Sequence, residues 1–182
     1  MVFQLNGERI ILRIPKPSDA NAIYKCVRDK TIVRYMTIPY PYRLKHAKDW
    51  IKKSNERFRK KTDYEFSIVF KVNNEIVGGM SLMHVDKKNQ NAEVGYWLAK
   101  KYWGQGLAKE ALKLALNFGF RRLKLRKMYA GVFEPNMRSS KLLESMGFRL
   151  EGKFRQHTKD RFSKNKWFND LRYGLLKSEY EF

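Results

Sequence analysis

The spacing of hydrophobic and polar residues changes along the chain, and each change predicts a new element. Arg9–Ile14 is apolar and rich in β-branched residues, which predicts a first strand that two prolines end. A helical spacing then begins with Ser18 as its N-cap, and a second one runs over Leu44–Lys61. Thr37–Arg43 has two prolines among aromatic residues and is predicted as a loop.

From Tyr64 onward, the spacing of apolar residues becomes that of β-strands. Three runs are apolar or alternating, and short polar turns separate them: Tyr64–Val72, Glu75–Val85 and Ala92–Ala99. Consecutive strands that are joined by tight turns pair in antiparallel fashion. This part of the chain therefore predicts a β-meander.

Helices and strands alternate in the rest of the chain. Gly106–Lys124 has the clearest helical spacing, since its apolar side chains recur every three or four residues. The other predicted elements are the strand Lys127–Phe133, the helix Asn136–Met146, and the strands Phe148–His157 and Trp167–Leu176. A meander followed by this alternation indicates a single mixed α/β domain.

Composition narrows the class of protein. The chain has 182 residues, of which 43% are hydrophobic, enough to bury the core of one domain. We expect this domain to span residues 8–177, with 178–182 as a short tail. Cys26 is the single cysteine, which excludes an internal disulfide framework and a cysteine-rich zinc site, so we expect no metal. Without a membrane-spanning apolar stretch or a signal pattern, the chain is expected to be soluble and cytoplasmic.

The net charge is unusually positive. The chain carries 39 basic and 18 acidic residues, a net charge of +21. Residues 1–98 contain 19 basic and 10 acidic side chains, and residues 99–182 contain 20 and 8, so the excess is not confined to a tail. Such a charge attracts polyanions, among them RNA, ribosomes and phosphorylated cofactors. Solubility or adaptation to heat or salt explains the charge about equally well.

A short glycine motif carries the first sign of chemistry. Gly104-Gln105-Gly106 lies between a predicted strand and the predicted helix that begins at Gly106. Glycines at alternate positions allow a tight turn, and the start of a helix offers unpaired N–H groups and partial positive charge. The segment is therefore a candidate site for a phosphate or pyrophosphate, although a plain structural turn has the same pattern.

Several motifs in order resemble one known family. The segments Glu93–Ala111 and Glu134–Phe148 are similar to the GNAT superfamily of acetyl-coenzyme A-dependent N-acetyltransferases. The similarity is strongest to its branch of ribosomal-protein N-terminal and spermidine acetyltransferases. The matching motifs are Gly95-Tyr96-Trp97, Gly104-Gln105-Gly106, Asn136 with Ser139, and Gly147-Phe148. The first and last predicted strands also match this branch, so the resemblance covers nearly the whole chain.

The resemblance implies a fold and a donor site. The fold would be a central, mostly antiparallel sheet of about six to seven strands with about four flanking helices, splayed between Ala92–Ala99 and Lys127–Phe133. The cofactor would be acetyl-coenzyme A (acetyl-CoA), with its pantetheine arm in the splay. Its expected contacts are the backbone of Trp97 and Leu98, the amide of Asn136, the charge of Lys101, and the N–H groups of Tyr102, Trp103, Gly104, Gln105, Gly106 and Leu107. Lys101 stands where the family usually has Arg or Gln, so a planar bidentate contact is lost.

Acetyl transfer to an amine needs a base, an oxyanion donor and an acid. Glu93 is the preferred base, directly or through water, with Glu134 and His84 as alternatives. The backbone N–H of Leu98 would serve the oxyanion. The resemblance implies Ser139 as the acid for the leaving thiolate, in preference to Ser140, because Leu143 replaces the tyrosine that many members use.

The resemblance implies an N-acetyltransferase that acts by direct attack of a primary amine in a ternary complex. The favoured acceptor is a protein N-terminus, such as that of a ribosomal protein, because a strongly cationic enzyme repels cationic polyamines. A polyamine or aminoglycoside acetyltransferase is the second interpretation. The third is a non-catalytic module that binds RNA or the ribosome. A homodimer is compatible with each, and no membrane partner is expected.

Overall fold

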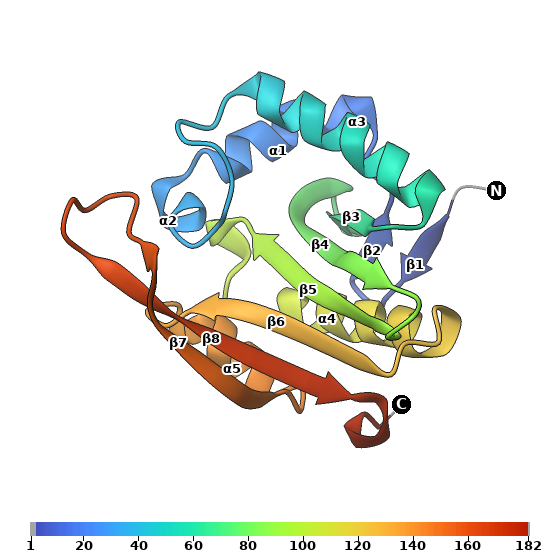
Figure 1. The fold of residues 1–182 in the computed structure, drawn as a ribbon. Helices are drawn as coiled ribbons and strands as arrows, with labels where there is room; N and C mark the ends of the chain where they lie inside the picture. The colour runs from blue at the N-terminus through green and yellow to red at the C-terminus, as the bar shows by residue number, and fades with distance from the viewer. Residues whose placement is uncertain (1–2, 182) are drawn as a thin grey trace.

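The architecture is one eight-stranded sheet with helices on both faces (Figure 1). The structure, a computed structural model, describes residues 3–181. The strand order is β1-β2-β3-β4-β5-β6-β8-β7. The strands are β1 (Gln4–Asn6), β2 (Ile10–Arg13), β3 (Tyr64–Phe70), β4 (Glu75–Asp86), β5 (Asn91–Leu98), β6 (Lys127–Phe133), β7 (Arg149–Lys159) and β8 (Trp167–Leu176).

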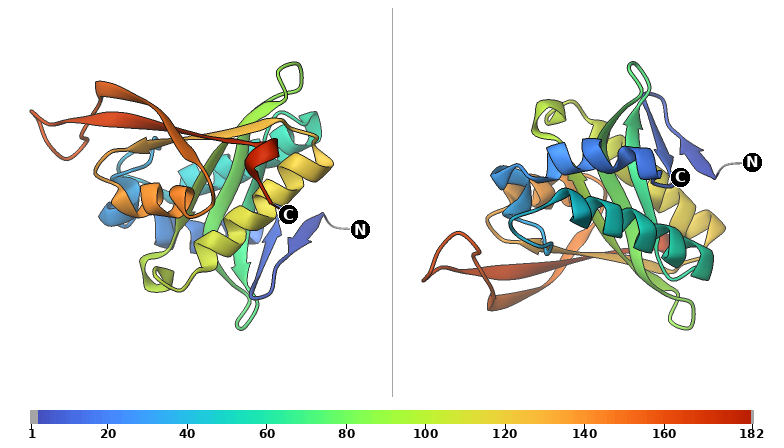
Figure 2. Two further views of the ribbon diagram at one scale, coloured as in Figure 1. Left: turned by 90° about the horizontal axis from the view of Figure 1, so that it is seen from below. Right: turned by 90° about the horizontal axis from the view of Figure 1, so that it is seen from above.

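The helices divide between the two faces of the sheet. Figure 2 shows α1 and α3 together over one face and α4 and α5 over the other. The helices are α1 (Ala20–Val27), α2 (Lys30–Val33), α3 (Leu44–Lys60), α4 (Leu107–Asn117) and α5 (Met137–Glu144). Each long helix buries one apolar stripe against the sheet, as its spacing predicts.

The core follows from these stripes. In α4, Leu107, Ala111 and Ala115 recur every four residues and are buried against the sheet. β3 is buried at six of its seven positions, because helices cover both of its faces. Phe66 of β3 is fully buried and is among the largest side chains in the core.

The prediction of an α/β fold with a mostly antiparallel sheet is confirmed, and the sheet has one or two more strands than predicted. The additional strand is β1, which has three residues, and α2 is an additional helix of four. Elements this short contain no full period of the hydrophobic pattern. The predicted helix Gly106–Lys124 ends as α4 at Asn117 and continues as a π-helical turn over Phe118–Arg122.

The sheet splays at β5 and β6, its one parallel pair among the described strands. Their pairing ends at Glu93 opposite Tyr129, after three residue pairs. Beyond that point β5 stays paired with β4, and β6 stays paired with β8 along its whole length. One edge of β5 from Val94 to Leu98 is therefore unpaired, and Figure 1 shows the two strands diverging.

A buried carboxylate ties the first strands to the loop before α1. Asp19 is 5% exposed, and its carboxylate accepts hydrogen bonds from both terminal nitrogens of Arg13, at N–O distances of 2.7 and 2.8 Å. It also accepts the backbone N–H of Lys16 and the hydroxyl of Ser67 in β3. Burial raises the pKa of Asp19, but the hydrogen bonds from Arg13, Lys16 and Ser67 outweigh it, so the pKa is lowered.

Candidate active site

The point where β5 and β6 separate holds the preferred base. Glu93 is partly exposed, and its Oε2 lies 3.8 Å from Nε2 of His84 in β4. His84 lies in an irregular part of the β4–β5 pairing with a φ of 53°, and its side chain is 71% exposed. The structure thus places two of the three candidate bases next to each other.

Gly131 leaves room beside Glu93. A Cβ at Gly131 would lie 2.9 Å from Nη1 of Arg172 and 3.7 Å from Oε1 of Glu93. Burial, followed by the charge of Glu93, raises the pKa of the neighbouring Tyr129 hydroxyl. Arg172 could not be predicted from local spacing, because only the pairing of β8 with β6 brings it opposite Gly131.

Glu134, the second candidate base, has other partners. It follows β6 and accepts a hydrogen bond from the ammonium of Lys153, while Nδ2 of Asn169 donates to it at 2.6 Å. The Lys153 and Asn169 hydrogen bonds lower the pKa of Glu134. A carboxylate whose charge is already stabilised is a weaker base, so the geometry favours Glu93.

On the other face of β5, a tyrosine meets the candidate acid. The hydroxyl of Tyr96 lies 2.9 Å from Oγ of Ser139, which is in the first turn of α5. Burial raises the pKa of Tyr96 to about 12, so its proton is retained at neutral pH. Ser140, the alternative acid, is buried at 3% exposure, whereas Ser139 is partly exposed.

Asn136 is the N-cap of α5. Its carbonyl accepts the backbone N–H groups of Ser139 and Ser140, at 3.0 and 3.3 Å. Its side chain makes no capping hydrogen bond. An N-cap asparagine ordinarily uses its side-chain oxygen to cap the helix. Here the amide is left for another partner.

The glycine loop has the geometry of a cradle at the start of α4. Gly104 and Gly106 have φ angles of +75° and +78°, which residues other than glycine rarely adopt. A Cβ at Gly104 would meet nothing within 4 Å, so the backbone here is open to a ligand. The indole N–H of Trp103 donates to the carbonyl of Leu98 at 2.7 Å, which holds the loop against the end of β5.

Lys101, the predicted electrostatic contact, is paired within the protein. Its ammonium lies 2.8 Å from Oε2 of Glu75, which also accepts the hydroxyl of Tyr102. The Lys101 side chain is 65% exposed, so its charge remains near the loop but is partly balanced. Gln105 turns its side chain back to the carbonyl of Lys101, which leaves the backbone N–H of Gln105 as the part available to a ligand.

Along the unpaired edge of β5, the backbone groups of every second residue face the gap between β5 and β6. Ala99 N–H donates to the carbonyl of Val77 in β4 at 2.8 Å. In an antiparallel ladder, neighbouring residues direct their backbone groups to opposite sides. The N–H of Leu98 therefore faces the gap, as does that of Tyr96, while the backbone of Trp97 faces β4. Of the two residues predicted to pair with a pantetheine arm, Leu98 is oriented for it and Trp97 is not.

The tip of the β7–β8 hairpin closes against the predicted proline-rich loop. Arg161 donates to the carbonyls of Met36 and Ile38, and Arg34 forms an ion pair of 2.6 Å with the buried Asp160. These contacts join the tip of the hairpin to the segment that connects α2 with α3. The hydrophobic spacing of the chain could not predict these contacts, because the partners are more than 120 residues apart.

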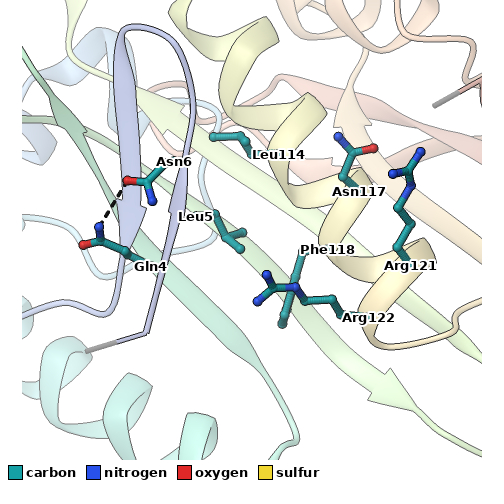
Figure 3. A pocket seen from close by; sticks show the side chains of 8 residues that line it. All are labelled: Gln4, Leu5, Asn6, Leu114, Asn117, Phe118, Arg121 and Arg122. Carbon is teal, nitrogen blue, oxygen red and sulfur yellow. Dashed lines mark hydrogen bonds between the residues drawn. The ribbon is translucent and has the colours of Figure 1, made fainter. Parts of the chain in front are cut away.

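A separate cavity of about 460 Å³ lies near the far end of α4 (Figure 3). Its lining consists of Gln4, Leu5, Asn6, Leu114, Asn117, Phe118, Arg121 and Arg122. It includes none of the predicted site residues. The glycine loop is at the opposite end of α4, so this cavity is distinct from the candidate active site.

The comparison with known families decides the identity. A family model described as an acetyltransferase (GNAT) domain matches residues 9–149, more than half of the chain. The chain belongs to the GNAT acetyltransferase family. It is thus an acetyl-CoA-dependent N-acetyltransferase, as the motifs predicted.

Curated relatives of this GNAT chain carry matching names. The p20 protein of Bacillus licheniformis, an uncharacterized N-acetyltransferase, is 32% identical over 176 residues, 97% of each chain. The spermidine N(1)-acetyltransferase of Escherichia coli K12 is 28% identical over 116 residues, 64% of this chain and 61% of that protein.

Solved structures confirm the GNAT fold. RimL, a ribosomal L7/L12 α-N-protein acetyltransferase in complex with coenzyme A, has a TM-score of 0.86 at 18% identity, over 96% of this chain and 98% of its own. The microcin C7 self-immunity acetyltransferase MccE, in complex with acetyl-CoA and AMP, has a TM-score of 0.81 at 19% identity, over 93% of each chain.

The residues of this GNAT site fit acetyl-CoA. The unpaired edge of β5 offers the N–H of Leu98, the space at Gly104 is open, and α4 begins directly behind it. These features suit an extended amide-containing arm followed by a pyrophosphate. Among residues 3–181, no three His, Cys, Asp or Glu side chains are grouped to hold a metal ion. No helix in the described range is long and apolar enough to cross a membrane.

Proposed function

We propose that this enzyme is cytoplasmic and transfers an acetyl group directly from acetyl-CoA to the N-terminal amine of a protein. The observation that carries the proposal is the pair of polar groups at the splay. Glu93 lies on the face of β5 that packs toward α1 and α3, and Tyr96 with Ser139 lies on the other. A base and an acid on opposite faces suit two substrates that meet between β5 and β6.

The donor side would hold the cofactor. Acetyl-CoA supplies a thioester whose carbonyl carbon is open to attack by a neutral amine. The N–H groups of Tyr102 and Trp103 already donate to the carbonyls of Ala99 and Lys100, so of the six predicted donors those from Gly104 to Leu107 would bind its pyrophosphate. Asn136 would bind a pantetheine amide. The N–H of Leu98 would donate to the carbonyl oxygen as negative charge develops there.

The base would act on the acceptor. An amine is protonated at neutral pH, so Glu93 accepts one proton from it, directly or through water, before the N–C bond forms. His84 lies beside Glu93, with its Nε2 3.8 Å from the carboxylate, and Arg172 lies near the same Gly131 position. As the C–S bond breaks, the leaving sulfur takes the electron pair.

The acid would act on that sulfur. Ser139 donates its proton to the sulfur, and Tyr96 can donate to the serine oxygen in turn, since their oxygens lie 2.9 Å apart. Tyr96 remains protonated at neutral pH because burial raises its pKa to about 12. As the amide forms, the nitrogen loses its second proton to water, and water returns a proton to the serine–tyrosine pair, so the transfer balances without an acyl-enzyme.

Charge supports a protein acceptor. The net charge of +21 repels a polycation such as spermidine and attracts a negatively charged partner, such as a ribosome. Six exposed basic side chains lie on α3, which follows the proline-rich loop: Lys45, Lys48, Lys52, Lys53, Arg59 and Lys60. The similarity to RimL supports the same class, and the similarity to spermidine N(1)-acetyltransferase supports the polyamine alternative.

The test is an acetyl-CoA consumption assay with several acceptors in parallel. We expect turnover on peptides with free N-termini, and none on the same peptides once their N-termini are blocked. Spermidine and an aminoglycoside serve as the competing acceptors. Faster turnover on either of them would overturn the choice of acceptor. Cofactor binding without turnover on any acceptor would favour a non-catalytic binding module.

A further inference from the structure

An arginine outside the glycine loop holds the loop in place. Arg9 lies just before β2, and its Nη1 donates to the carbonyl of Gln105 at 2.8 Å. Its Nη2 lies 3.3 Å from where a Cβ on Gly106 would be. The guanidinium therefore sits against the Gln105–Gly106 peptide, although 96 positions of sequence separate the two.

Glu110 fixes Arg9 in this position. One carboxylate oxygen accepts Nε of Arg9 at 3.1 Å, and the other accepts the backbone N–H groups of Arg9 and Ile10 at 2.8 and 3.3 Å. Glu110 belongs to the first full turn of α4, and its side chain is 16% exposed. The ion pair of Arg9 and Glu110 thus joins the start of β2 to the first turn of α4.

The orientation of a peptide group determines what this contact does. In a trans peptide the C=O and N–H of one group point in opposite directions. Arg9 holds the carbonyl of Gln105 from one side, so the N–H of Gly106 points to the other. Gly106 would not by itself fix this orientation, because glycine tolerates both positive and negative φ. The arginine selects the state with a φ of +78° at Gly106.

We propose that Arg9 is a positioning residue for the cofactor, which keeps the Gln105–Gly106 peptide turned so that its N–H faces the pyrophosphate. This rests on the donor site described under the proposed function. Arg9 acts through the peptide and does not touch the reacting atoms. Its hydrogen bond to the carbonyl also polarises the peptide, which strengthens the N–H as a donor.

The experiment compares two donors that differ in the pyrophosphate. Acetyl-CoA has it, and S-acetylpantetheine has the same thioester and arm without it. For Arg9→Met we expect the KM for acetyl-CoA to rise about tenfold, as for loss of a hydrogen bond from a charged group, with kcat nearly unchanged. The kinetics with S-acetylpantetheine should stay within about twofold of wild type, because that donor does not use the loop.

Further variants separate this role from general stability. Arg9→Lys keeps the charge and one donor and should recover part of the affinity, while Arg9→Gln keeps a donor without the charge. Thermal unfolding of each variant is measured as a control. Should Arg9→Met weaken both donors equally, or neither, the positioning role is wrong. If Arg9→Met does not fold, Arg9→Lys and Arg9→Gln decide, by whether their losses are confined to acetyl-CoA.

Calorimetry distinguishes this inference from the proposed function. Coenzyme A binds without any acceptor, so its dissociation constant tests Arg9 whatever the acceptor is. If wild type and Arg9→Met have the same dissociation constant for coenzyme A, the inference about Arg9 is wrong and the proposed function is unaffected. Wild-type protein that does not bind coenzyme A removes the donor site, and the proposed function with it.

Discussion

At the scale of single residues, Ser139 and Ser140 are neighbours in sequence with different surroundings. Ser139 is partly exposed and 2.9 Å from the hydroxyl of Tyr96, whereas Ser140 is buried. Ser139→Ala should lower kcat and kcat/KM together and leave the affinity for coenzyme A unchanged, because the proposed role of this hydroxyl is to protonate the leaving sulfur. Ser140→Ala is the matched control. Steady-state kinetics that showed loss only in Ser140→Ala would transfer the role to that serine.

Glu93 provides the second prediction at this scale. Glu93→Gln keeps the shape of the side chain and removes its basicity, so the rate at neutral pH should fall by ~10²–10⁴. The loss should shrink at high pH, where more of the amine is neutral without help. The measurement is a pH–rate profile of both enzymes, with coenzyme A binding measured separately. A ratio near one at every pH would show that Glu93 has no role as a base and would leave Glu134 to be tested.

The sequence offers candidate site residues where they share one continuous motif. Glu93 and Ser139 came from short segments with family-like spacing. Tyr96 was part of a quoted motif, but its contact with Ser139 depends on how α5 packs against β5. Arg172 of β8 and Arg9, just before β2, are far in sequence from the groups they lie against, and no local pattern in a single sequence encodes such a contact.

At the scale of elements, Asp19 joins β2, β3 and the turn before α1. Asp19→Asn should lower the free energy of unfolding by about 3 kcal/mol at neutral pH, because it leaves the guanidinium of Arg13 half-buried without its counter-charge. Urea denaturation measures this difference. Asp19→Glu is the control, since it keeps the charge and changes the length.

The pH dependence of this difference has a definite sign. The pKa of Asp19 is lowered in the folded protein, so its contribution is complete above the unfolded value of about 4 and is lost as the pH falls through the folded value. The gap between wild type and Asp19→Asn should therefore narrow below about pH 4. A gap of constant size from neutral to acidic pH would argue against the charged form of Asp19 as its source.

Periodicity predicted the longer elements because each contains at least one full repeat of apolar positions. It could not predict the splay. The segment from Val94 to Leu98 has the same composition whether or not a strand pairs with it. Beyond Glu93 and Tyr129, β5 stays with β4 and β6 stays with β8, and hydrophobic spacing does not encode which partner each strand keeps.

At the scale of the whole molecule, the charge of +21 makes acceptor capture depend on salt. With acetyl-CoA saturating, kcat/KM for an acidic peptide should fall several-fold as salt rises from about 50 to 200 mM, because screening shortens the range of attraction. A neutral peptide with the same first residue is the control and should change little. Equal salt dependence for both peptides would mean that the charge does not act on the acceptor.

The short junction between β5 and β6 also has a consequence for how the protein opens. The sheet consists of two contiguous stretches, β1–β5 and β6–β8, whose backbones are paired across three residue pairs only. Amide hydrogens at this junction should exchange with solvent faster than those between β3 and β4, because a small local opening breaks all of its hydrogen bonds. Coenzyme A would contact β5 on one side and α5 on the other. Its binding should slow exchange at Glu93 and Tyr129, far from its own phosphates.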